Sequence, residues 1–356
     1  MVKVIGLDII ANTPALGADS APTEKERLDG VVDDAVLFER LGFDGYAIGE
    51  RHHEPFVSSS PPVILSSIAA RTSRIKLFTG VTLLSVLDPV RVAEDYATLD
   101  LLSGGRLELI VGKGNGPEQT ELFGIERDDA WDTQHDNYRL LRALWSGEPV
   151  DWDPPADRPR VRNSSLRAAR VHPQPLQERI RVWHGSSTSE GTVELAAEHG
   201  DPIWVANAQK SVEGYRPLVD RYRRAWAEAG RDPADALVGA GFSVFVTKRS
   251  QDAVEAFRPI YEARIASRVD TYNRFDPSVL FSSFEDYLER SSALIGSPQQ
   301  AIDKLAAYHE AYGYSAISIP GHPGDWPREA WKESLSLFRD EVLPAVNAFA
   351  PDPVEW

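Results

Sequence analysis

The sequence of 356 residues has no cysteine, a single methionine, and no apolar run long enough to cross a membrane. The absence of cysteine excludes disulfide bonds, thiolate metal sites and cysteine catalysis. A bilayer-spanning helix needs roughly 20 mostly apolar residues, so we expect no transmembrane segment. Residues 1–8 look like a strand and not like a signal peptide, and we therefore expect a cytoplasmic protein.

Basic residues are also scarce. The 38 lysines and arginines stand against 54 aspartates and glutamates, which gives a formal charge of −16. So acidic a protein would repel nucleic acid and anionic membranes, and we expect neither as a partner. The hydrophobic fraction of 42% and the charged fraction of 26% are ordinary for a globular protein. A soluble enzyme is therefore the default expectation.

Short apolar runs alternate with helical patterns along the whole chain. We interpret eight runs as strands buried on both faces, as in a parallel sheet, at residues 4–10, 46–49, 76–83, 107–111, 182–185, 203–206, 241–246 and 316–319. Helical patterns fill the intervals, for example at 23–41, where Gly42 ends the pattern. Eight β/α units predict a TIM (β/α)8 barrel with insertions, formed by residues 1–356 as a single domain.

A doubly wound α/β sheet is the competing fold. It usually has fewer strands and often opens with a glycine-rich phosphate turn after the first strand. Residues 10–14, which follow the first predicted strand, contain no such turn. The barrel is therefore the better interpretation.

Two segments are longer than ordinary connections. Residues 151–175 are rich in proline and arginine, and residues 247–296 form a long connection after the seventh predicted strand. Long loops at the carboxyl end of a barrel often carry function, so 247–296 is a candidate lid over an active site. The alternative is a surface excursion that only covers hydrophobic residues.

Two adjacent histidines, His52 and His53, follow the second predicted strand, in a chain with only eight histidines. The carboxyl end of a strand is where α/β proteins place their chemistry. Imidazole is the side chain best able to move protons near neutral pH. The pair is therefore a catalytic candidate, although it could equally satisfy backbone groups in a strand-end turn.

Two other strand ends look suited to an anion. Residues 186–189, which include Thr188 and Ser189, are four successive hydroxyl residues before a predicted helix that contains Thr192. The free N–H groups and dipole of a helix N-terminus attract a phosphate, although one of these hydroxyls would also serve as an ordinary N-cap. Lys113 lies in the glycine-rich stretch 112–116 and could supply a positive charge, but glycines also make plain turns.

The ordered set of motifs resembles the bacterial luciferase-like, flavin-dependent monooxygenase family. The matching stretches run from the first strand to the last helix, at residues 49–53, 79–82, 88–95, 99–106, 189–202 and 296–299. Each stretch is modestly specific, whereas their order along the chain is highly specific. The resemblance implies a TIM barrel that uses reduced FMN as cosubstrate and O2 as oxidant.

The resemblance also implies roles for particular residues. His52 looks like the family's catalytic histidine, and His53 like its supporting neighbour. Lys113 falls where bacterial luciferase has a phosphate-binding arginine, and Ser189 and Thr192 fall on its phosphate-binding serine and threonine. Gly80 and Val81 fall where the family often has a non-prolyl cis peptide beneath the flavin ring.

Three departures from bacterial luciferase limit the resemblance. Gly112 replaces its reactive cysteine, and Gly116 stands near the position of a tyrosine. Lys113 cannot bind a phosphate in the bidentate manner of arginine. Light emission is therefore not expected. The broader monooxygenase chemistry does not depend on these residues.

We expect a flavin hydroperoxide, formed from O2 and reduced FMN that a separate reductase delivers, to oxygenate a small organic substrate while His52 assists proton transfer. One alternative is a hydride-transferring oxidoreductase on the same barrel that uses the deazaflavin F420; another is a flavin-binding protein without catalysis. A metal hydrolase is poorly supported, because adjacent histidines on a strand point to opposite sides, and we expect no metal.

The resemblance further implies a homodimer. In the luciferase-like family, the helices that correspond to residues 62–70 and 89–102 form a dimer interface. Here these helices carry many small or apolar residues, among them Ile64, Leu65, Ile68, Ala69, Val92, Ala93 and Ala97. Simple packing on the barrel is the alternative explanation for about half of them. The identity of the substrate cannot be inferred from the sequence.

Overall fold

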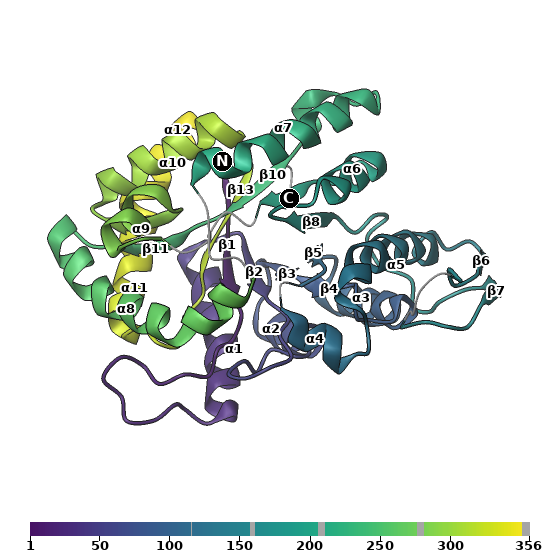
Figure 1. Cartoon of the computed structure of the whole chain (residues 1–356), viewed down its shortest axis with the longest axis horizontal. Helices are drawn as coiled ribbons and strands as arrows, with labels where there is room; N and C mark the ends of the chain where they lie inside the picture. Colours follow the sequence, from purple (N-terminus) through teal and green to yellow (C-terminus); the bar gives the residue numbers. More distant parts are fainter. Residues whose placement is uncertain (115, 157–160, 206–210, 276–280, 351–356) are drawn as a thin grey trace.

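The computed structural model describes residues 1–114, 116–156, 161–205, 211–275 and 281–350, with the side chains of 265–275 left out. Its centre is a closed barrel of parallel strands surrounded by helices, so the predicted TIM barrel is confirmed (Figure 1). Within the described residues, the barrel strands are β1 (Lys3–Asp8), β2 (Gly45–Ile48), β3 (Lys76–Thr79), β5 (Leu107–Gly112), β8 (Val182–Ser186), β9 (Ile203–Val205), β10 (Val238–Gly241) and β13 (Ala316–Pro320).

Neighbouring strands pair in the order β3-β2-β1-β13-β10-β9-β8-β5, and β5 returns to β3 to close the barrel. Every pairing in this ring is parallel, for instance Ile5 with Gly45 and Leu77 with Leu107. A short strand, β4 (Thr82–Leu83), adds to the upper part of β5. Because all strands run the same way, their carboxyl ends share one mouth, which is where barrel enzymes place their active sites.

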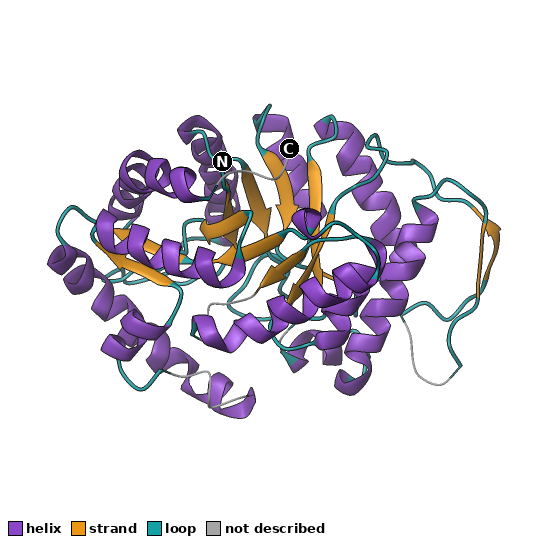
Figure 2. Ribbon diagram, turned by 90° about the horizontal axis from the view of Figure 1, so that it is seen from above, coloured by secondary structure: helices purple, strands orange, loops and turns teal. Residues whose placement is uncertain are grey.

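The helices of the described residues cover the outside of the barrel (Figure 2). They are α1 (Glu24–Leu41), α2 (Pro61–Arg71), α3 (Pro89–Ser103), α4 (Pro117–Leu122), α5 (Ala130–Leu144), α6 (Glu190–His199), α7 (Val212–Glu228), α8 (Ser250–Phe275), α9 (Phe284–Arg290), α10 (Pro298–Tyr312), α11 (Arg328–Leu337) and α12 (Leu343–Phe349). Single helical turns occur at Arg127–Asp129 and Pro233–Asp235, and Phe338–Val342 forms a π-helical turn between α11 and α12.

Local sequence signals explain where several helices begin and end. Thr23 and Glu26 form a capping box at the start of α1, and Gly42 ends that helix in the left-handed conformation at φ 82°. Gly104 and Gly200 end α3 and α6 in the same way. Such signals are local, so the sequence predicted these helices to within a few residues.

The barrel interior is filled by apolar side chains from successive strands. The cluster that packs there consists of Ile5, Ala47, Phe78, Ile110, Trp183, Trp204 and Ala316. The indole of Trp204 occupies the space that Gly239 leaves open, since a Cβ at that glycine would lie 2.4 Å from the ring. Beneath them, Glu108 accepts hydrogen bonds from the indole of Trp183 at 2.8 Å and from Arg181 at 3.1 Å. The interior is therefore a packed core, as in other TIM barrels.

The prediction that residues 241–246 form the seventh barrel strand is wrong. The barrel strand is β10, which ends at Gly241, and the following β11 (Ser243–Val246) pairs in parallel with β12 (Ala293–Gly296) in a separate small sheet. The sequence reading missed Val238–Gly241 because its small residues VGAG resemble a turn, whereas SVFV has the β-branched and aromatic residues typical of strands.

Both long connections contain secondary structure. Residues 151–175 include the second strand of an antiparallel ribbon, β6 (Val150–Trp152) with β7 (Leu166–Ala169), which projects from the barrel (Figures 1 and 2). Residues 247–296 form α8, α9 and β12 on the opposite side. Arg264 of α8 pairs with Asp325, in the loop after β13, at 2.6 Å. Residues 276–280 lie outside the described part, and closure of this segment over the mouth stays a prediction.

A search of the described residues finds no helix that is both long enough and apolar enough to pass through a bilayer.

Candidate active site

The mouth of the barrel brings the predicted site residues to one rim. His52 follows β2, Gly80 and Val81 follow β3, Lys113 follows β5, and Ser189 follows β8. These four strands are consecutive neighbours around the barrel. β2 and β8 are three strand spacings apart, roughly 14 Å along the wall. The histidine and the hydroxyl cluster therefore face the same opening from different strands.

His52 is held by a buried carboxylate. Its Nε2 lies 2.8 Å from Oε1 of Glu50, and the His52 side chain is only 8% exposed. The other oxygen of Glu50 accepts the backbone N–H of Leu83 at 2.9 Å, so Glu50 joins the end of β2 to β4. Because an ionised carboxylate only accepts, Nε2 is the donor in this contact, and Nδ1 does not take part in it. Glu50 therefore fixes the orientation of His52.

His53 points elsewhere. Its Nδ1 donates to the backbone oxygen of Glu54 at 2.9 Å, and its ring contacts Phe56 at 5.1 Å between centroids. These are contacts of a strand-end turn, which was the alternative interpretation of the histidine pair. A role for His53 as the supporting neighbour of His52 stays a prediction.

Helix α4 and the residue that ends it cover the other side of His52. The ring of Phe123 meets the imidazole edge-on, with centroids 4.8 Å apart, and Phe123 is 38% exposed. On the same helix, Gln119 is fully buried against Gly114, and neither polar atom of its amide has a hydrogen-bond partner in the described structure. Two unpaired amide atoms beside the mouth suit a polar ligand there.

Four glycines form one layer at the mouth. Residues that point into the barrel alternate along each strand, and four inward positions lie in the core cluster: Ala47, Phe78, Ile110 and Trp183. Two positions nearer to the mouth, the same four chain segments each carry a glycine: Gly49, Gly80, Gly112 and Gly185. Apolar side chains pack closely against this layer, because Ile9 lies over Gly49, Leu7 lies over Gly80, and Val81 lies over Gly112 and Gly185.

Val81 lies across two of these glycines. A Cβ at Gly112 would lie 2.9 Å from Cγ2 of Val81, and one at Gly185 would lie 3.1 Å from its Cγ1. The peptide bond between Gly80 and Val81 is cis, as the family resemblance implies. The apolar face of Val81 and the surrounding backbone thus form a smooth surface at the centre of the mouth. Contact of Gly80 and Val81 with a cofactor stays a prediction.

The hydroxyl cluster lies at the start of α6. Oγ of Ser189 accepts the backbone N–H of Thr192 at 3.2 Å and its hydroxyl at 3.0 Å, so Ser189 is the N-cap of the helix. Oγ of Ser186 accepts the backbone N–H of Ser189 at 3.0 Å. Thr188 is exposed, whereas Thr192 is fully buried. The N-cap interpretation is therefore correct for Ser189. The cluster of Thr188, Ser189 and Thr192 at this helix N-terminus is called the cradle below, and its binding of a phosphate stays a prediction.

Lys113 lies between the floor and this cradle. Its ammonium donates to the backbone oxygen of Gly114 at 3.0 Å and lies 5.2 Å from the ring centroid of Trp131, at the start of α5. Burial and the nearby charge of Arg127 lower the pKa of Lys113. No carboxylate pairs with Lys113 among the contacts of the described residues, so its charge is available to an anion.

A buried ionic network supports the cradle from behind. Asp201, at the turn after α6, contacts Arg142 of α5 at 2.5 Å and Arg179 at 2.9 Å, and accepts the hydroxyl of Tyr138. Burial acts to raise the pKa of Asp201, but His184 and Arg142 outweigh it and hold that pKa well below its usual range. The network joins α5, β8 and the end of α6, which fixes the position of α5 beside the cradle.

Three residues at this mouth were missed in the sequence. Glu50 was visible in the motif at 49–53, but only the partners of its carboxylate identify its role. Gln119 gave no signal, since burial of an amide depends on tertiary packing. His135 of α5 contacts Thr192 at 3.2 Å, and its place on one helical face with Trp131 was a readable signal.

The described residues contain no group of three or more histidines and carboxylates arranged to hold a metal ion. The arrangement places an apolar floor, one oriented imidazole and a helix N-terminus with clustered hydroxyls and a nearby lysine at one mouth. These features suit a planar organic cofactor that carries a phosphate, since each part of such a molecule finds a matching surface.

Comparisons with known proteins agree with this geometry. The sequence pattern of the family described as luciferase-like monooxygenase matches residues 8–315. A Sinorhizobium fredii protein, y4wF, is 45% identical over 322 residues, which cover 88% of this chain and 90% of the relative.

Two solved structures share the fold. The oxygenating constituent of 3,6-diketocamphane monooxygenase from Pseudomonas putida, a Baeyer-Villiger enzyme in complex with FMN, has a TM-score of 0.78 at 18% identity and covers 97% of this chain and 99% of its own. An F420-dependent secondary alcohol dehydrogenase, in complex with an F420–acetone adduct, has a TM-score of 0.72 at 18% identity, with the same coverages.

Proposed function

Because this chain belongs to the luciferase-like monooxygenase family, we propose that it uses reduced FMN and O2 to oxygenate a small organic substrate. The glycine layer at the mouth carries this proposal, because Gly49, Gly80, Gly112 and Gly185 let apolar side chains pack closely on the backbone next to an oriented imidazole. Reduced FMN would supply the electrons that activate O2, because protein side chains cannot supply these electrons.

The residues of the chain hold and orient the cofactor in this proposal. Ser189, Thr192 and Lys113 bind its phosphate, and Thr188, which is exposed at the same turn, contributes from the rim. Gly80 and Val81 support the ring from below. The family resemblance favours this orientation, and the FMN complex of the similarly folded Pseudomonas putida protein supports the choice of cofactor.

His52 is the proposed proton-transfer group. Its Nε2 proton is committed to Glu50, so Nδ1 is the nitrogen that exchanges a proton with the reacting molecule. Phe123 shields the imidazole on one side, which keeps water away from it. His53, bonded to Glu54, acts in this proposal only by fixing the turn that presents His52. A separate reductase supplies the reduced cofactor, in line with the description of the Pseudomonas putida protein as an oxygenating constituent.

The test mixes the purified protein with reduced FMN and, separately, with reduced deazaflavin F420. We expect spectral changes and O2 consumption above the free-flavin rate only with FMN. Hydride transfer from the deazaflavin would favour the alternative that the F420-dependent neighbour represents. Binding of FMN without any O2 consumption or substrate turnover would indicate a flavin carrier.

A second test concerns His52 itself. The variant His52→Ala should bind FMN with unchanged affinity but lose most of its turnover, because the floor and cradle are intact while the proton-transfer group is missing. The matched control is His53→Ala, which removes an imidazole from the neighbouring position and should change turnover much less. Unchanged turnover in His52→Ala would remove His52 from this role.

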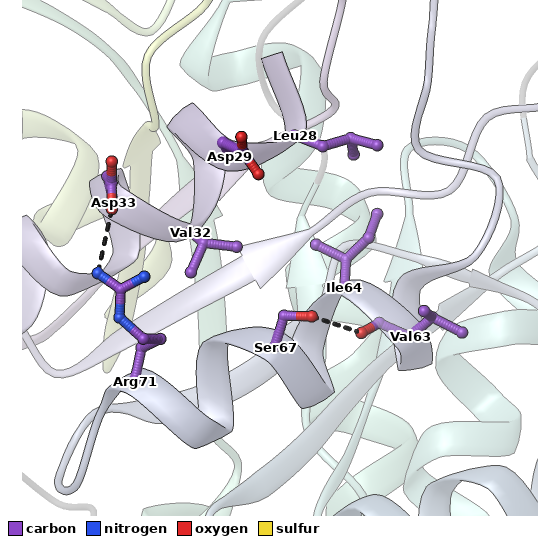
Figure 3. A pocket seen from close by; sticks show the side chains of 8 residues that line it. All are labelled: Leu28, Asp29, Val32, Asp33, Val63, Ile64, Ser67 and Arg71. Carbon is purple, nitrogen blue, oxygen red and sulfur yellow. Dashed lines mark hydrogen bonds and ion pairs between the residues drawn. The ribbon is translucent and has the colours of Figure 1, made fainter. Parts of the chain in front are cut away.

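We also propose a homodimer, and the structure changes which residues would form it. Six of the seven apolar residues named on α2 and α3 are buried within the chain, and only Ile64 remains partly exposed. A groove of about 610 Å³ lies instead between α1 and α2, lined by Leu28, Asp29, Val32, Asp33, Val63, Ile64, Ser67 and Arg71 (Figure 3).

In this proposal the groove packs against the same groove of a second copy. Val63 is 65% exposed at its edge, and the pair of Arg71 with Asp33 at 3.3 Å is exposed, so it can be exchanged with a second copy across a two-fold axis. Light scattering at micromolar concentration should give the mass of a dimer for the natural chain and of a monomer for Val63→Glu. A monomeric natural chain would refute the proposal.

A further inference from the structure

One histidine beside the anion cradle has no role so far. His135 lies on α5, one turn after Trp131 and half-buried, and its Nε2 lies 3.2 Å from the hydroxyl oxygen of Thr192. A Cβ at Gly191 would lie 3.5 Å from Cε1 of the same ring. The imidazole therefore packs directly against the first turn of α6, where the cradle is.

The hydrogen bonds of the cradle have a defined direction. Thr192 donates its hydroxyl proton to Oγ of Ser189 at 3.0 Å, so its oxygen must accept from Nε2–H of His135. Ser189 receives both the N–H and the hydroxyl of Thr192. The chain of bonds runs from His135 through Thr192 to Ser189, and ends at the hydroxyl that faces an incoming anion.

The surroundings of His135 favour its neutral form in the free protein. Burial lowers its pKa, Arg139 on the same helix and His184 on β8 lower it further, and Asp132 and Asp136 act in the opposite direction. From α6 it contacts Thr192 and lies next to Gly191. Trp131 contacts both Lys113, whose ammonium lies 5.2 Å from its ring centroid, and His135, whose ring centroid lies 6.1 Å away.

We propose that His135 takes up a proton when a phosphate monoester enters the cradle, so that cofactor binding is coupled to protonation of this one side chain. The arriving dianion favours the imidazolium form, and Nδ1 accepts the proton from solvent. Thr192 then turns its hydroxyl from Ser189 to the phosphate while it continues to accept from Nε2–H of His135. His135 thus acts through Thr192 as a positioning residue, in a bond chain that the charge strengthens.

This inference rests on the proposed function, since it concerns the phosphate of the same cofactor. The two can be tested separately, because riboflavin has the same ring as FMN but lacks the phosphate on which this inference depends. Oxidised FMN and riboflavin can both be titrated without turnover, and calorimetry in two buffers of different ionisation enthalpy counts the protons taken up with each.

We expect FMN to bind the natural protein with uptake of a fraction of a proton at pH 7, and riboflavin to bind with none. In His135→Gln, which retains an N–H donor but cannot be protonated, proton uptake should disappear and leave only the small proton release of the phosphate, which titrates near pH 6 and binds as the dianion. The dissociation constant for FMN should rise about tenfold at pH 6.5, and less at pH 8.5, because the charge-assisted bond is lost.

Two further variants keep the test decisive. His135→Lys carries a permanent charge, so it should bind FMN tightly with the proton uptake abolished. His309→Gln removes a histidine that is also buried in part, on the distant α10, and should behave as the natural protein does. If His135→Gln and the natural protein take up the same number of protons, the inference is wrong while the proposed function stands. If the natural protein binds no FMN, the proposed function fails as well.

Discussion

At the scale of single residues, Glu50 is the side chain on which the orientation of His52 depends. Its two oxygens accept from two N–H groups, the imidazole of His52 and the backbone of Leu83. In Glu50→Gln one oxygen is replaced by an NH2 group, so one of these donors loses its partner. We expect turnover to fall on the order of 10–100-fold, the usual cost of losing an orienting carboxylate, while FMN affinity stays within about twofold. Stopped-flow kinetics and FMN titration measure the two quantities, and the exposed Glu54→Gln is the control.

A second prediction at this scale concerns the floor of the mouth. A Cβ at Gly112 would lie 2.9 Å from Val81, which would have to shift. We expect Gly112→Ala to lower the free energy of unfolding by about 1–3 kcal/mol and to weaken FMN binding. In the control, Gly30→Ala on α1, no atom lies within 4 Å of the new Cβ, and helix propensity should raise stability by about 0.5–1 kcal/mol. Equal FMN affinity in Gly112→Ala and the natural chain would contradict the assignment of the floor.

At the scale of elements, two helices with similar N-caps allow the effect of a cap on stability to be distinguished from its effect on FMN binding. Ser189 caps α6 and Ser297 caps α10, each by accepting a backbone N–H three residues further on. Replacement of either by alanine should cost about 1 kcal/mol of stability, the usual value of an N-cap. Only Ser189→Ala should also weaken binding of FMN, because only α6 has the cradle. Denaturant unfolding and FMN titration on both variants check this, and an equal loss of FMN affinity would show that the cap acts through stability alone.

The elements also show how far the sequence could be interpreted. The barrel, its helices and the strand ends that carry His52, Lys113 and Ser189 were predictable, because periodicity and caps are local signals. The boundary between β10 and β11 was not, since the choice of partner for each strand depends on distant residues. The same holds for Gln119, whose burial no neighbouring residue reveals.

At the scale of the whole molecule, the buried His322 near the end of the last barrel strand makes the free energy of unfolding depend on pH. Burial lowers the pKa of His322, which follows β13, from 6.5 to about 4, and the charge of Arg328 adds to this. Between these values the unfolded chain binds more protons than the folded one, so stability falls as the pH drops from 6.5 towards 4. From pH 7 to 5 this histidine should account for a loss of up to about 2 kcal/mol.

The variant His322→Gln isolates that contribution. Glutamine keeps a donor for the backbone oxygen of Trp326, which His322 contacts at 3.0 Å, but it does not titrate. Urea unfolding at pH 7 and pH 5 should therefore give a smaller loss of stability in the variant than in the natural chain. Equal losses would mean that other groups, such as the buried His184, cause the acid sensitivity.

The four glycines at the mouth have a consequence for how this protein can change. A Cβ at Gly49, Gly80, Gly112 or Gly185 would lie between 2.4 and 3.1 Å from a neighbouring atom, so a side chain at any of them would displace the surrounding structure. Substitutions that change substrate preference must then occur among the residues around the mouth, for example at Phe123, while the residues that bind the cofactor stay the same. Related proteins would thus keep the same reaction while their substrate selectivity changes.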